Sequence, residues 1–377
     1  MSVHGRVHFI NFARKLTVAS VLFLAPMHFL ALGFDGWRIG GLISFYALAP
    51  LFVAFPTGWT NDRFSIAGVV RAGLVLEAAL LFLAAWTRSF SGFAAVFLGL
   101  GIANNALDIS LNSLFYKDET AIDQNRKYAV YVFWNAVGPA VGVLGGGYLA
   151  QIADFRTLFL VFGGITVVVI FAARSFEGAR FHAVPLREYV QALARRKTLL
   201  FIVFLVILAL HWAVEGTVYS PFLKDAFGLN GFQASLYMSA GLFAMSFAAF
   251  LIGFKKFEAK ANARLLLIFM ALSGAGLILM TVKNVYLSLG FRLLHDIADG
   301  GQGALITVAI SRLFEKRNIG GSAGLVVSIM IFGQMAGAMF FSPLGYRYGL
   351  RYPFWIAGGL MIVNAVYGVW LFRNREY

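Results

Sequence analysis

The chain has 377 residues, of which 60% are hydrophobic and 13% are charged. A soluble protein carries about 25% charged residues, so this composition excludes a large soluble domain and indicates an integral membrane protein. The lack of cysteine excludes disulfides and thiolate metal sites. The net charge of +14 is spread over the segments between apolar stretches, a pattern that argues against nucleic-acid binding.

Apolar segments of roughly 17–25 residues recur along the whole chain, the length that a tilted helix needs to cross a bilayer. We expect twelve transmembrane helices, with the tenth longer than the others. The expected spans are 12–33, 38–58, 69–86, 90–115, 128–150, 157–174, 199–223, 232–254, 265–282, 285–314, 322–346 and 352–372. The sequence therefore predicts an all-α membrane protein.

The basic residues predict the orientation of these spans. Most of the 31 Lys and Arg residues fall on the side of the membrane that holds both termini, and Arg14 and Lys15 are assigned to this group. An excess of basic residues marks the cytoplasmic side. We therefore expect cytoplasmic termini, a bacterial inner membrane as the location, and contacts with anionic membrane lipid.

The longest polar segment, 175–198, predicts the domain organisation. It separates an N-terminal six-helix bundle (1–174) from a C-terminal six-helix bundle (199–377), and its apolar stripe predicts an amphipathic helix at the cytoplasmic leaflet. The halves form a weak repeat, in which Gly138 matches Gly337. Two pseudo-symmetric bundles of this kind place a binding site near the midplane between them.

The tenth span contains the most informative residues. Arg292, His295, Asp296 and Asp299 follow at spacings that put them on one face of a helix. A charge at this depth costs about 3 kcal/mol on insertion scales, so such groups face protein or water and commonly mark an ion or substrate path.

Polar residues of the fourth and seventh spans add to this stripe. The fourth span carries Asn104, Asn105, Asp108 and Asn112 on one face, and the seventh carries an i, i+4 pair, His211 and Glu215. In the repeat Asn104 corresponds to Asp299, so we expect these two residues to face each other. A carboxylate that leaves water binds a proton more tightly and a nearby cation opposes this, so the pattern favours proton coupling. The same acids and histidines suit a divalent metal.

Local motifs resemble those of the major facilitator superfamily. Gly58, Asp62 and Arg63, in the segment after the second span, match the start of the signature G-x-L-A-D-R-x-G-R-[RK] of that family. The later glycine and the basic pair of the signature do not match. The resemblance implies that Asp62 and Arg63 form a gate latch at the cytoplasmic side.

Two further motifs are similar to patterns of the same family. The fifth span contains Gly138-Pro139-Ala-Val-Gly142, which resembles the G-P-x-x-G motif of proton-coupled antiporters. The segment from Arg292 to Gly300 resembles the motif R-x-x-Q-G-x-x-x-G, better known on the fourth helix. The resemblance implies that helices 1, 4, 7 and 10 line a central cavity.

These observations define the predicted site. The proton-coupling residues are expected to be Asp296, Asp299, Arg292, His295, Glu215 and Asp108. The substrate-binding residues are expected to be Asn104, Asn105, Asn112, His211, Trp212, Tyr219, His28, Gln302, Gln334 and Asn135. The gating residues are expected to be Gly58, Asp62, Arg63, Gly138 and Pro139.

The sequence predicts a monomeric secondary active transporter of the alternating-access type. Four acids against Arg292 favour a small cationic or neutral substrate, and the antiporter-like motif favours proton-coupled efflux. Proton-coupled uptake of a sugar or other nutrient, a divalent-metal carrier, and a non-transport sensor or scaffold are the alternatives. No nucleotide-binding motif and no nucleophile–base motif are present, so we expect no ATP use, no cofactor and no enzymatic activity.

Overall fold

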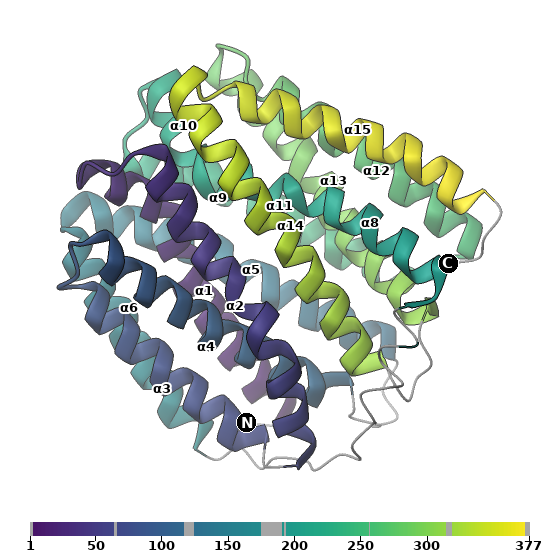
Figure 1. Cartoon of the computed structure of the whole chain (residues 1–377), viewed down its shortest axis with the longest axis horizontal. Helices are drawn as coiled ribbons and strands as arrows, with labels where there is room; N and C mark the ends of the chain where they lie inside the picture. The colour runs from purple at the N-terminus through teal and green to yellow at the C-terminus, as the bar shows by residue number, and fades with distance from the viewer. Residues whose placement is uncertain are drawn as a thin grey trace.

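The computed structural model describes residues 3–63, 66–116, 124–174, 191, 194–255, 257–313 and 319–373. Every regular element in these ranges is an α-helix. The first half of the chain forms α1 (Val3–Ala31), α2 (Gly36–Arg63), α3 (Ile66–Ala84), α4 (Phe90–Tyr116), α5 (Gln124–Ile152) and α6 (Phe155–Ala173) (Figure 1).

The second half begins with three short helices in place of one continuous span. They are α8 (Arg196–Leu210), α9 (Trp212–Thr217) and α10 (Tyr219–Phe227), interrupted at His211 and Val218. The rest of the half forms α11 (Gly231–Gly253), α12 (Ala259–Leu279), α13 (Val285–Leu313), α14 (Ile319–Tyr348) and α15 (Tyr352–Phe372). We call the side where α1 begins and α15 ends the terminal side, and the other the opposite side.

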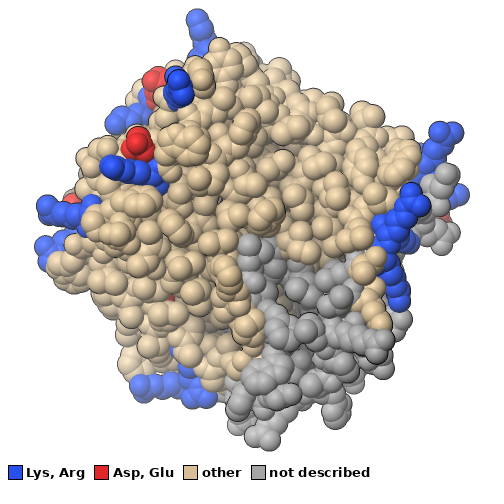
Figure 2. Space-filling model, viewed as in Figure 1, with Lys and Arg blue, Asp and Glu red and all other residues tan. Residues whose placement is uncertain are grey.

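The helices have the length and surface of membrane spans. Within the described residues, nine helical segments are long and apolar enough to cross a bilayer. The other three long helices, α2, α5 and α13, have 28, 29 and 29 residues and carry more polar groups or prolines. In Figure 2 the charged side chains gather at the rims of the visible face, and a broad uncharged surface lies between them.

The bounds of two helices differ from the sequence-based expectation. α1 begins at Val3 rather than at residue 12, so Arg14 and Lys15 lie well inside the helix and not at its polar start. The helical backbone of α2 continues to Arg63, so the segment 58–63 belongs to the end of a helix rather than to a connection. The expected amphipathic helix lies almost wholly outside the described residues.

Small residues bring α1 and α5 into direct backbone contact. A Cβ atom on Gly138 would meet the carbonyl oxygen of Phe12, and one on Gly142 would meet that of Leu16. The contacts are one helical turn apart on both helices, so the two parallel helices pack in register. We call this contact the α1–α5 seam.

The second half repeats this arrangement between α8 and α14. A Cβ atom on Gly333 would meet the carbonyl oxygen of Val206, and one on Gly337 would meet that of Leu210. Gly337 is the residue that matches Gly138 in the sequence repeat. The weak repeat is therefore expressed as the same helix packing in both halves.

The most extensive contacts between the halves are those of α5 with α11 and of α2 with α14. Ser239 of α11 donates a hydrogen bond to the carbonyl oxygen of Ala140 at 2.8 Å. Ser342 of α14 donates to the carbonyl oxygen of Gly36 at 2.7 Å, near the opposite side. These contacts hold α1 and α4 of one half across from α9 and α13 of the other.

Candidate functional site

The polar residues of α13 form a buried network with α9, which we call the C-half cluster (His211, Glu215, Arg292, His295, Asp296 and Asp299). The Arg292 guanidinium is fully buried and forms ion pairs with Glu215 and with Asp296. It also lies 4.8 Å from the ring centroid of Tyr219, a cation–π contact. The stripe predicted from the sequence therefore faces protein.

Two histidines converge on one carboxylate of this cluster. His211 Nε2 lies 2.9 Å from Asp299 Oδ2, and His295 Nε2 lies 3.8 Å from the same oxygen and 3.1 Å from Glu215 Oε1. His211 stands at the break between α8, which ends at Leu210, and α9, which begins at Trp212. This break lies one turn before Glu215 and places His211 beside Asp299. The imidazole rings meet edge to face, with centroids 5.6 Å apart.

The hydrogen bonds of the two rings determine where hydrogens must lie. His211 Nδ1 contacts the carbonyl oxygen of Leu208. His295 Nδ1 lies 3.0 Å from the carbonyl oxygen of Ser273 and 2.9 Å from its hydroxyl, which donates its hydrogen to Asp299. A carbonyl oxygen only accepts, and a hydroxyl that donates its hydrogen to Asp299 can only accept from the ring, so both Nδ1 atoms carry a hydrogen. Each Nε2 atom faces a carboxylate oxygen. Each of these contacts is therefore a hydrogen bond only if a second proton is held between the Nε2 atom and the carboxylate oxygen.

The charge balance of the C-half cluster leads to the same conclusion. With neutral imidazoles, Arg292 stands against three carboxylates, those of Glu215, Asp296 and Asp299. Two added protons would neutralise the cluster, and so would one divalent cation. His211, His295 and Asp299 offer ligand atoms within 4.8 Å of one another, as do Glu215, His295 and Asp296.

A second network, which we call the N-half cluster (Asn11, Arg14, Lys15, Asn104 and Asp108), lies between α1 and α4. The buried Arg14 guanidinium donates to Asn11 Oδ1 at 2.8 Å and to the side chains of Asn104 and Asp108. Lys15 Nζ donates to the other oxygen of Asp108 at 3.1 Å. Lys15 and Asp108 keep side-chain exposures of 22% and 29%, so this end of the network is accessible.

Sequence reasoning missed Arg14 and Lys15 as site residues because they lie at the start of the expected span 12–33 and were counted with the basic residues of the cytoplasmic side. A signal was present, since Asn11 and Arg14 are one helical turn apart and precede a long apolar run. Tyr46, which accepts a hydrogen bond from Asn104, and Ser273, which donates to Asp299, were also missed. A lone tyrosine or serine in an apolar span carries no comparable signal.

Several predicted substrate-binding residues do lie at these networks. Asn135 accepts a hydrogen bond from Asn11 at 3.2 Å, and Gln302 donates to Asp299 at 3.0 Å. The ring of the half-buried Trp212 lies 5.9 Å from that of His211. Tyr219 is fully buried beneath Arg292, as described above, while Asn105 is buried on α4. The structure thus brings most of the predicted polar residues into two clusters.

Other predicted residues lie elsewhere. His28 packs among phenylalanine rings near the opposite side, with centroids 4.4 Å from Phe155 and 5.7 Å from Phe93. Asn112 accepts a hydrogen bond from Tyr131, which links α4 to α5. Gln334 is half-buried on α14. The structure does not bring His28 to either cluster.

Asn104 and Asp299 each form hydrogen bonds within their own cluster, and their facing one another stays a prediction. The predicted gate residues fall into two groups. The side chains of Asp62 and Arg63 and the surroundings of Gly58 lie outside the described part of the structure, so the latch stays a prediction. Gly138 lies in the α1–α5 seam, so the glycines of the antiporter-like motif have a packing role, and gating by Gly138 and Pro139 stays a prediction.

Comparison with protein families supplies the assignment. The model of the family described as Major Facilitator Superfamily matches residues 7–261 and 221–377, which together span nearly the whole chain. The chain belongs to the Major Facilitator Superfamily. It is therefore a multi-pass membrane transporter and not an enzyme, and a small-molecule substrate follows from this fold. A comparison with curated protein sequences gives no match.

Solved structures of superfamily transporters share the fold. The nucleoside transporter NupG has a TM-score of 0.79 at 14% identity, with 100% of both chains covered. A bacterial homologue of the human lysosomal transporter Spinster, in an inward-facing conformation, has a TM-score of 0.78 at 14% identity, with 98% of this chain and 96% of that chain covered. A POT family transporter in complex with a conjugated peptide has a TM-score of 0.78 at 13% identity, over 96% and 94% of the chains.

Proposed function

We propose that this protein is a proton-coupled secondary transporter of a small polar solute, and that the C-half cluster holds the coupling protons. The observation that carries the proposal is the convergence of His211 and His295 on Asp299. Both Nδ1 atoms are directed at backbone carbonyls, so the Nε2 contacts to carboxylates require protons. Histidine suits this role because it exchanges protons near neutral pH.

The charges of both clusters bear on the substrate. The expectation of a cationic or neutral substrate rested on four acids against Arg292 alone. Arg14 and Lys15 now stand beside Asp108 in the N-half cluster, so the bases of the two clusters nearly balance the acids. This balance favours a neutral polar solute. The partly exposed pair of Lys15 and Asp108 offers one donor and one acceptor to such a solute.

The sequence supports no particular direction of coupling once the helix packing is known. Gly138 and Gly142 are explained by the α1–α5 seam, so efflux by antiport has no separate support from that motif. We therefore propose coupling itself and let the assay assign the direction. Solute that enters a liposome with protons acidifies the lumen, whereas solute that enters in exchange for protons makes it alkaline.

The test is a flux assay in liposomes that contain a pH-sensitive dye. The purified protein is screened against nucleosides, sugars, short peptides and organic cations. We expect at least one neutral solute to produce a lumenal pH change. The Asp299→Asn variant should lose this change while it keeps solute counterflow, because counterflow needs no net proton movement. Glu258→Gln, at an exposed acid before α12, is the matched control and should behave as wild type.

Three results would contradict the proposal. The first is wild-type proton flux in Asp299→Asn. The second is solute transport by the wild type without any pH change at any imposed gradient. The third is flux of a divalent metal such as Mn²⁺ in place of an organic solute, which would assign the cluster to metal transport, consistent with its ligand spacing.

A further inference from the structure

A hollow of about 540 Å³ opens on the opposite side of the second half. Three separate parts of the chain form it: the end of α10 with Asp225, the connection between α12 and α13 with Lys283, and the start of α15 with Arg351, Tyr352 and Trp355. Its size falls in the range of about 300–1,000 Å³ that is typical of small-ligand sites. It is distinct from both clusters described above.

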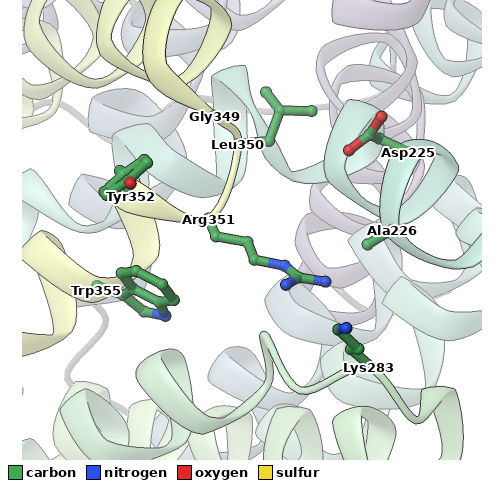
Figure 3. A pocket seen from close by; sticks show the side chains of 8 residues that line it. All are labelled: Asp225, Ala226, Lys283, Gly349, Leu350, Arg351, Tyr352 and Trp355. Carbon is green, nitrogen blue, oxygen red and sulfur yellow. The ribbon is translucent and has the colours of Figure 1, made fainter.

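The charged groups of this hollow face one another without pairing. Figure 3 shows the Arg351 guanidinium extended across the hollow, between the carboxylate of Asp225 and the ammonium group of Lys283. In the described part of the chain, no ion pair within 4.0 Å involves any of these three side chains. Two cations and one acid leave a net positive charge, which suits a singly charged anion.

The residues around the hollow are those expected at the level of lipid headgroups. Trp355 is 44% exposed and donates a hydrogen bond from Nε1 to Thr281 Oγ1 at 2.8 Å, which fixes its ring beside Tyr352. Amphipathic aromatic residues of this kind mark the membrane interface. Immediately beyond them, Ile356 and Val363 expose apolar side chains on α15, where acyl chains would lie.

We propose that this hollow binds the phosphodiester headgroup of an anionic membrane lipid in the leaflet on the opposite side. Arg351 donates to the phosphate oxygens in the bidentate manner of a guanidinium, and Lys283 supplies a second charge. Tyr352 and Trp355 pack on the glycerol region, and the acyl chains follow the exposed surface of α15. The site is independent of the proposed proton coupling.

The test is a lipid titration of the purified full-length protein, followed by native mass spectrometry. Phosphatidylglycerol is the probe and phosphatidylcholine the neutral comparison. We expect the double variant Lys283→Gln/Arg351→Gln to bind phosphatidylglycerol about thirtyfold more weakly, equivalent to about 1 kcal/mol for each basic residue lost. Lys224→Gln, an exposed lysine at the same end of α10 that does not line the hollow, should bind as wild type.

A variant that is expected to bind the lipid more tightly provides the stronger test. Asp225→Asn removes the only acid among the described residues that line the hollow. We therefore expect about fivefold tighter binding of phosphatidylglycerol, which misfolding cannot produce. Equal affinity in the wild type and the double variant, or no gain in Asp225→Asn, would overturn the proposal. Soluble glycerol phosphate is titrated by calorimetry in parallel. Binding of it as tight as that of the lipid would assign the hollow to a soluble anion and overturn the lipid assignment.

Discussion

Removal of Arg292 should destabilise the protein by at least about 3 kcal/mol. Its side chain is fully buried and pairs with Glu215 and Asp296, whose side chains are 19% and 2% exposed. Loss of one partner from a buried ion pair costs about 3–5 kcal/mol, because the other charge stays buried without compensation. Because Glu215 is partly exposed, its unpaired charge contributes less than Asp296 to this loss of stability. The lost cation–π contact with Tyr219 adds roughly 0.5–2 kcal/mol to it.

The assay compares Arg292→Met with a triple variant that also carries Glu215→Gln and Asp296→Asn. Unfolding is followed by denaturant titration in detergent. We expect the triple variant to be more stable than Arg292→Met, because its neutral amides need no buried cation. Arg38→Met, at an exposed arginine near the opposite side, should change stability by less than about 0.5 kcal/mol. If the triple variant is the less stable of the two, the reasoning from uncompensated charge is wrong.

Three further predictions concern packing and capping. Gly241→Ala should destabilise the protein by about 1–3 kcal/mol, because the added Cβ would collide with the carboxylate of Asp296. Gly142→Ala should cost a similar amount by pushing α5 away from the carbonyl of Leu16. Asp154 caps α6 and has a lowered pKa because it accepts hydrogen bonds from the first turn. The difference in stability between wild type and Asp154→Ala should therefore hold at neutral pH and vanish as the pH falls through that lowered pKa.

The controls for these predictions use the same denaturant titration. Gly290→Ala is the reference for both glycine variants, because its Cβ would meet no atom within 4 Å in the same kind of helical backbone, so it should leave stability unchanged or slightly raised. A loss in Gly290→Ala equal to that in Gly142→Ala would show that contact of the added Cβ with a neighbouring helix is not the cause of the loss. Hydrogen exchange in the first turn of α6 monitors Asp154, and a difference that grows with acidity would contradict its assignment as a cap.

The fold was predictable because its main determinants are local. Apolar length specified the spans, and the matched glycines Gly138 and Gly337 revealed the repeat. The break at His211 was not predictable, because no proline or glycine stands within four residues of it. The break at Val218 did have a signal that was not used, since Pro221 has no N–H to donate to the carbonyl of Thr217. The start of α1 was missed because several residues from position 3 onward are polar. The charge of Arg14 in this helix is paired with Asp108 of α4, and the sequence of α1 alone does not reveal that partner.

The candidate site was predictable on α13 and α9 and only partly on α1. Asp296 and Asp299 are acids inside an apolar run, so helical spacing alone placed them on one face. Arg14 lies close to the N-terminus, where a basic residue is ordinarily a topology signal. Its pairing with Asp108 depends on the approach of two helices far apart in sequence. The same dependence on tertiary contact explains why Asn104 and Asp299, matched by the repeat, lie in separate clusters.

The α1–α5 seam constrains how the transporter can move. A glycine pressed against a carbonyl at successive turns prevents gradual sliding, since the next matching position is a full turn of 5.4 Å away. Both helices must therefore be carried as one rigid body through the transport cycle. Arg14 on α1 and Asn135 on α5 move with this rigid body. Their spacing is therefore constant while the opposing α13 approaches or withdraws. Asn11, Arg14 and Lys15 on α1 therefore keep a fixed geometry relative to α5, and any rearrangement within the N-half cluster falls to Asn104 and Asp108 on α4, which lies outside the seam.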